Sequence, residues 1–123
     1  KAFEMIVEAF SKGDKAVLQD LLSKNIYARF EEALQEKQAK GQREEITLVS
    51  LLDSSITGAS QDGKMAHFTV KFVSEQIRVT RDIETGTIIE GNASQIDKVE
   101  DLWTFSRALR TANPNWQVTE TRG

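Results

Sequence analysis

Apolar residues recur with the spacing of a helix from the start of the chain to Gly41. The first stripe consists of Phe3, Ile6, Val7 and Phe10. Gly13 ends this first helix, and Asp14 can cap the next one by accepting a hydrogen bond from a free amide. The second stripe consists of Val17, Leu18, Leu21 and Leu22. Ser23 or Asn25 can cap a third helix. One face of that helix consists of Ile26, Phe30, Ala33, Leu34 and Lys37. The pattern predicts three consecutive helices.

After Gly41 the period changes to that of a strand. Residues 46–57 are rich in β-branched side chains, and a turn at residues 61–63 leads into a second strand from Met65. The alternation there predicts one face made of Ala66, Phe68, Val70 and Phe72. We expect this strand to continue to Val79 with a bulge near Glu75, where the parity shifts. A turn at residues 84–86 and a short strand at residues 87–90 follow.

The C-terminal residues 101–121 predict one antiparallel hairpin. A strand with Trp103 ends at Arg107, a loop contains Pro114, and a closing strand opens on Trp116. Aromatic and β-branched residues favour a half-buried pleated surface, and Asn-Pro-Asn is a turn signal.

The order of residues in this hairpin, Asp-Leu-Trp-Thr-Phe and then Asn-Pro-Asn-Trp, resembles the C-terminal domain of the Tim44-like family. That family comprises the mitochondrial inner-membrane import-motor adaptor, its bacterial relatives and a mitochondrial ribosomal protein. The resemblance continues upstream through residues 3–22 and 27–34 and the strand from Thr69, so it covers residues 1–123 almost completely. Family members carry further sequence before this point, so we expect the chain to be a domain excised from a longer protein.

Three helices followed by an antiparallel meander predict an α+β fold. The resemblance implies a curved antiparallel sheet wrapped around the N-terminal helices, the nuclear transport factor two-like cone. That fold encloses an apolar pocket, which can hold a ligand, carry catalytic groups or be filled by side chains. The residues that we expect at the pocket, and at any apolar ligand within it, are Phe30, Phe68, Phe72, Trp103 and Phe105.

The composition excludes several classes of function and of binding site. The chain has 123 residues and a net charge of −3, which suits one domain and argues against a nucleic-acid partner. No apolar run approaches the ~18 residues that a membrane span needs. The absence of cysteine excludes disulfides and thiolate metal sites, and no pattern in the sequence indicates a metal or another cofactor.

Three side chains could carry chemistry. His67 alternates with the phenylalanine face, which predicts a surface histidine, and Tyr27 is expected at the rim of the third helix's apolar stripe. Asp101 shares a face with Trp103 and Phe105, so its charge is predicted to point towards the aromatic side. Two interpretations stay open: Asp101 pairs with an arginine or lysine near the open end of the cone, or it acts as a tuned acid or base inside the pocket.

The resemblance implies a non-enzymatic, peripheral inner-membrane module that docks on the membrane and binds proteins in preprotein translocation or membrane protein assembly. Its partners would be anionic lipid and membrane or translocon proteins, in bacteria or on the matrix side in mitochondria. The candidates for membrane contact are Phe3, Phe10, Lys12 and Lys15, although the same apolar stripe could be core. The alternative is a small-molecule-binding or enzymatic domain of the ketosteroid isomerase or dehydratase type.

Overall fold

The computed structural model describes residues 2–109 and 116–122. In chain order the elements are α1 (Ala2–Lys12), α2 (Lys15–Leu21), α3 (Lys24–Ala39), β1 (Gln42–Asp62), β2 (Met65–Asp82), β3 (Ile88–Gly91), β4 (Asp97–Ala108) and β5 (Gln117–Arg122). The three helices and the antiparallel strands confirm the α+β prediction. The predicted turn around Pro114 lies outside the described residues.

Local signals place the helix boundaries. The Asp14 carboxylate accepts a hydrogen bond from the backbone N–H of Val17 at 3.3 Å and so caps α2. The Ser23 hydroxyl accepts from the N–H of Ile26 at 3.4 Å, so Ser23 rather than Asn25 caps α3. Gly41 follows the end of α3 with a φ of +69°, a conformation that glycine adopts without a steric penalty.

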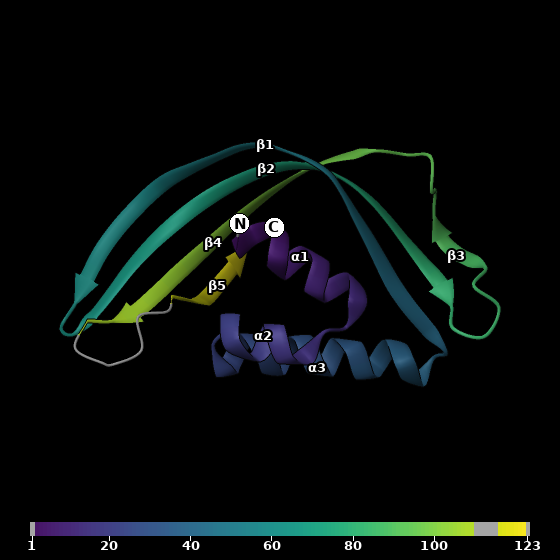
Figure 1. Cartoon of the computed structure of the whole chain (residues 1–123), viewed down its shortest axis with the longest axis horizontal. Coiled ribbons are helices and arrows are strands. Elements are labelled where there is room, and N and C mark those ends of the chain that lie inside the picture. Colours follow the sequence, from purple (N-terminus) through teal and green to yellow (C-terminus); the bar gives the residue numbers. More distant parts are fainter. Residues whose placement is uncertain (1, 110–115, 123) are drawn as a thin grey trace.

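The sheet has the order β1-β2-β4-β5, and β3 pairs with the C-terminal end of β2. It bends into an arch with α1 beneath its concave face, and α2 and α3 lie below α1 (Figure 1). All strand pairs are antiparallel. The result is the curved sheet around N-terminal helices that the sequence and its resemblance implied.

The predicted bulge in the second strand is wrong. The pairing of β2 with β4 is unshifted from Met65 to Gln76, whereas β1 shifts register in three places, between Leu48 and Ser50, Leu51 and Asp53, and Ile56 and Gly58. An extra residue in the edge strand β1 disturbs one ladder, but in the central strand β2 it would disturb two. The bulges therefore accumulate at the edge.

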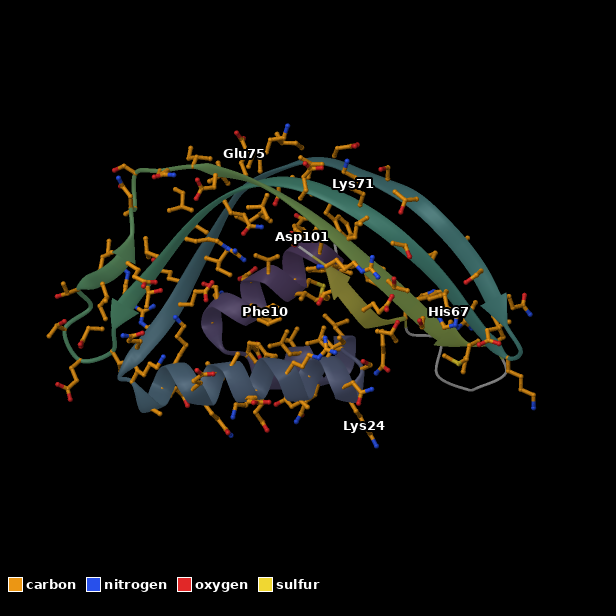
Figure 2. All side chains as sticks on the ribbon, turned by 180° about the vertical axis from the view of Figure 1, so that it is seen from behind. Phe10, Lys24, His67, Lys71, Glu75 and Asp101 are labelled. Carbon is orange, nitrogen blue, oxygen red and sulfur yellow. The ribbon has the colours of Figure 1, made fainter. Side chains whose placement is uncertain are left out.

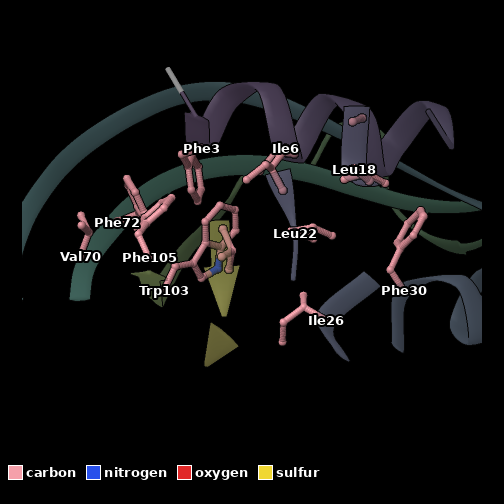
Figure 3. Packing of buried hydrophobic residues seen from close by; sticks show 13 residues of the cluster. Phe3, Ile6, Leu18, Leu22, Ile26, Phe30, Val70, Phe72, Trp103 and Phe105 are labelled. Carbon is pink, nitrogen blue, oxygen red and sulfur yellow. The ribbon is translucent and has the colours of Figure 1, made fainter. Parts of the chain in front are cut away.

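The core fills the space between α1 and the centre of the sheet. The ring of Phe3 stacks on Phe72 at 4.4 Å and lies 4.7 Å from Trp103 (Figure 3). Leu18 and Val118 are also fully buried. Beside this core the half-buried Trp116 packs edge-on against Phe68, with ring centroids 4.6 Å apart. Both tryptophans thus belong to the packed interior.

Candidate functional site

A cavity of about 870 Å³ lies between the C-terminal halves of α1 and α3, the start of β1 and the concave face of the sheet. Its apolar wall is formed by Val7, Phe10, Phe30, Leu34, Ile46 and Trp103. A smaller hollow of about 210 Å³ lies between α1, α3 and β5, and Phe10, Phe30 and Trp103 line it too. These three rings therefore border both spaces.

Of the five predicted pocket residues, the structure places Phe30 and Trp103 on the cavity wall. Phe72 instead packs against Phe3, Trp103 and Phe105, and Phe68 packs against Phe105 and Trp116. Phe68, Phe72 and Phe105 thus form a solid cluster beside the cavity. Ligand binding by any of the five remains a prediction.

Asp101 lies on the cavity wall, half-buried and opposite Phe72 in the β2–β4 ladder. Burial raises the pKa of its carboxyl above the ordinary value, and the nearby positive charge of Arg78, which also lines the cavity, offsets part of that effect. The face of Asp101 was predicted correctly, because β4 is regular and side chains alternate along it. No ion pair between Asp101 and Arg78 is found among the described residues, and a role of Asp101 as an acid or base remains a prediction.

Gln76 also lies on this wall, and no sequence argument singled it out. Its side chain is 2% exposed, and its amide nitrogen donates a hydrogen bond to the Ser74 hydroxyl at 3.0 Å. Its carbonyl oxygen has no hydrogen-bond partner among the described residues. The inner face of β2 thus changes from aromatic at Phe68 and Phe72 to polar at Ser74 and Gln76, a change that is visible in the alternation and could have located the residue.

The rim of the cavity is basic. Seven of its lining side chains are basic (Lys12, Lys15, Lys37, Lys40, Arg43, Arg78, Arg122) and three are acidic (Glu36, Glu44, Asp101). Seven against three leaves an excess of four positive charges, in a chain whose net charge is −3. These ten residues come from seven elements, between α1 and β5, so the fold brings together charges from both ends of the chain.

The membrane-contact candidates fall on different surfaces. Lys12 and Lys15 are exposed on the basic rim, where they pair with Glu8 at 2.6 Å and with Glu31 at 3.8 Å. Phe10 is half-buried on the cavity wall. Phe3 is 1% exposed and covered by the sheet, so a membrane cannot reach it while α1 is in place. None of the helices in the described part of the chain is long and apolar enough to cross a membrane.

His67 lies on the outer side of the sheet, as predicted, but is half-buried there. Its Nδ1 is 2.5 Å from the Ser106 hydroxyl oxygen, which is 2.7 Å from the hydroxyl of Thr119. The sequence analysis missed this histidine–serine contact between strands. Ser106 is only 3% exposed, so a substrate cannot approach it, and the contact is a hydrogen-bonded ladder across β2, β4 and β5.

Tyr27 is half-buried at the rim of the apolar stripe of α3, as the sequence predicted. Its hydroxyl donates a hydrogen bond to the Glu31 carboxylate at 3.2 Å. Burial and this negative partner both raise the pKa of the Tyr27 hydroxyl, which keeps it in the neutral form.

Solved structures of other proteins share the fold. The intermembrane space region of the chloroplast protein ARC6 superposes with a TM-score of 0.60 at 16% identity, over 98% of this chain and 87% of that one. A periplasmic fragment of TraM superposes with a TM-score of 0.58 at 12% identity, over 98% of this chain and 90% of that one. No curated protein matches the sequence significantly. The model of the Tim44-like domain, however, matches residues 1–123, the whole of the sequence. The chain therefore belongs to the Tim44-like domain family.

Proposed function

We propose that this domain is a peripheral inner-membrane module that docks on anionic lipid and binds membrane or translocon proteins during preprotein translocation or membrane protein assembly. Membership of the Tim44-like family supports this role. The observation that carries it is the basic rim around an apolar cavity in an otherwise acidic chain. Basic clusters beside apolar surface are attracted to the negative potential of anionic membranes.

The rim is a better lipid-contacting surface than the apolar stripe of α1. Lys37 lies in the last turn of α3, Lys40 is its C-cap and Arg43 lies at the start of β1, so three positive charges are close together in the sequence. No ion pair of Lys37 or Lys40 is found among the described residues. Each such charge contributes about 1 kcal/mol to binding near an anionic surface. The apolar stripe of α1 packs in the core instead, so it is not available to insert into a membrane.

Co-sedimentation with vesicles tests the lipid contact. The domain should pellet with vesicles that contain cardiolipin at low salt, should be released at high salt, and should ignore neutral phosphatidylcholine vesicles. The double variant Lys37→Glu/Lys40→Glu reverses two rim charges and should lower the partition coefficient at least about tenfold.

The matched control is Lys24→Glu/Lys98→Glu, which changes the net charge equally at exposed positions that do not line the cavity. Lys24 begins α3, about 24 Å along the helix from Lys40; Figure 2 shows it at the end of the helices away from Phe10. If the control binds as weakly as the rim variant, the net charge rather than the rim controls binding. If the unmodified domain does not pellet at low salt, the membrane role is lost.

A second candidate function, a small-molecule-binding or enzymatic domain, is favoured by one observation. A half-buried carboxylate with a raised pKa, Asp101, faces a large apolar cavity, which is the arrangement that ligand-binding and acid–base sites share. Binding or turnover that Asp101→Asn removes and Glu100→Gln retains would support this candidate. Glu100 immediately precedes Asp101 in β4, and it pairs with Lys71 outside the cavity.

A further inference from the structure

The polar groups of the cavity wall indicate what kind of small molecule the site suits, an inference that rests on the second candidate function. We propose that the cavity binds a neutral, elongated, apolar molecule whose hydroxyl groups form hydrogen bonds with Gln76 and Asp101. Most of the wall is apolar and aromatic, from Phe10, Phe30, Ile46 and Trp103. The specificity of such a site comes from its few polar groups.

Gln76 requires a hydrogen-bond partner. Its amide has two polar ends, and the described residues supply one bond, that to Ser74. A buried polar atom without a partner destabilises the protein, because it has lost its hydrogen bonds to water. A hydroxyl suits this position because it can donate to the carbonyl oxygen or accept from the amide N–H, so it satisfies the free end in either orientation of the amide.

Asp101 provides the second contact, at a different place on the same wall. It lies opposite Phe72, four residues from Gln76 along β2, which corresponds to about 13 Å of extended strand. The concave curvature brings side chains on this face closer together. Because the two polar groups lie at different positions along the wall, the geometry favours a molecule with a polar group at each end.

The charges beside Asp101 explain why the polar group that the ligand places there should be neutral. A cationic group near Asp101 would meet Arg78, which is close enough to affect the pKa of Asp101. An anionic group at the same place would meet the carboxylate itself. The hydroxyl is the group that forms a hydrogen bond with a carboxylate or an amide without adding a charge to a desolvated cavity.

A matched series of rigid molecules tests the proposal: biphenyl, 4-hydroxybiphenyl and 4,4′-dihydroxybiphenyl, titrated into the intact domain by calorimetry. The three share one apolar body and differ in the number of hydroxyl groups. Each hydroxyl should tighten binding about three- to tenfold, the usual net effect of one hydrogen bond.

Two variants assign the hydroxyl groups to their partners. Gln76→Leu and Asp101→Leu each remove one polar anchor and retain side-chain volume, so in each variant the diol should bind no more tightly than the mono-alcohol. Glu75→Gln and Glu100→Gln are the matched controls. Glu75 accepts a hydrogen bond from Ser50 and Glu100 pairs with Lys71, both away from the cavity (Figure 2 shows Lys71 and Glu75 on the outer side of the arch). These two variants should keep the full preference for the diol.

The outcomes distinguish a failure of the proposed ligand class from a failure of the small-molecule-binding function. If all three compounds bind equally, the cavity is a binding site but the hydroxyl preference is wrong. If none binds, both the small-molecule function and its ligand class fail. A preference for the diol that survives Gln76→Leu and Asp101→Leu would place the hydroxyl contacts elsewhere and overturn the proposal.

Discussion

Glu100 and Asp101 are neighbours in sequence, yet the structure gives them opposite properties. Glu100 lies on the outer face, where a hydrogen bond from Lys71 at 2.9 Å and the charge of that lysine lower the pKa of its carboxyl. Asp101 lies on the inner face, where burial raises the pKa of its carboxyl against the weaker opposing effect of Arg78. The alternation of side chains along β4 therefore determines which carboxylate is stabilised in its charged form.

These shifts predict opposite effects of pH on stability. Because the folded state raises the pKa of Asp101, ionisation of Asp101 destabilises the fold, and this cost appears as the pH rises from the ordinary value of 3.8 through the folded value. Asp101→Asn should therefore increase the free energy of unfolding at pH 7 relative to the unmodified domain. The gain should shrink as the pH approaches about 4, as urea unfolding at a series of pH values would show.

Glu100→Gln supplies the comparison of opposite sign. The folded state lowers the pKa of Glu100, so its contribution is present above the ordinary value of 4.5 and is lost as the pH falls through the lowered one. Removing this exposed carboxylate should slightly lower stability at neutral pH, and added salt should reduce the difference. If Asp101→Asn instead lowers stability at pH 7, its attraction to Arg78 outweighs its burial.

At the scale of single elements, β3 depends on one glycine. Gly91 has a φ of +87° and pairs with Val79, and a Cβ atom added to it would lie 2.5 Å from the carbonyl oxygen of Arg78. A contact of that length is a clash with backbone, which cannot move aside as the end of a side chain can. The close approach of β3 to β2 therefore requires glycine at this position.

Gly91→Ala should accordingly destabilise the domain by about 1–3 kcal/mol, from the left-handed backbone strain and the clash together. Gly58→Ala in β1 is the control, because a Cβ there meets nothing within 4 Å and its φ is not positive. That variant should be neutral or slightly stabilising, since alanine restricts the unfolded chain. Denaturant midpoints of the two variants decide the matter, and equal midpoints would contradict the requirement for glycine.

At the scale of the whole molecule, the sheet extends well beyond the helices that cover it. The end of the β1–β2 hairpin reaches past α1 and α2 (Figure 1), and every residue of β1 from Asp53 to Asp62 is exposed. The centre of the sheet is covered instead, with Phe72, Trp103 and Phe105 all buried. The two parts of one continuous sheet therefore have very different support from packing.

Hydrogen exchange should reveal this difference. Amides of β1 between residues 53 and 62 that are bonded to β2 should exchange at least about a hundredfold faster than the bonded amides of Trp103 and Phe105, because local opening of the arm exposes little apolar surface. Mass spectrometry of peptides from the two segments provides the measurement. Equal protection would mean that the arm and the core open together as one unit.

Much of the secondary structure of this protein could be predicted from the sequence by itself, because it depends on interactions between residues that are close in the sequence. The helices, their caps at Asp14 and Ser23, the strand parity and the inward face of Asp101 all follow from interactions within a few residues or from the two periods of secondary structure. The order of residues in the final hairpin also carried the family resemblance, which the match of the family model confirms.

Only the tertiary structure decided how distant segments meet. It placed the extra residues in β1, since whether a strand is at the edge or the centre depends on its neighbours in the sheet. It assigned Phe3 to the core and Lys12 to the rim, although both belong to one amphipathic helix. The basic rim, the buried amide of Gln76 and the contact of His67 with Ser106 all join residues that no local period relates, because long-range packing rather than sequence spacing sets their distances.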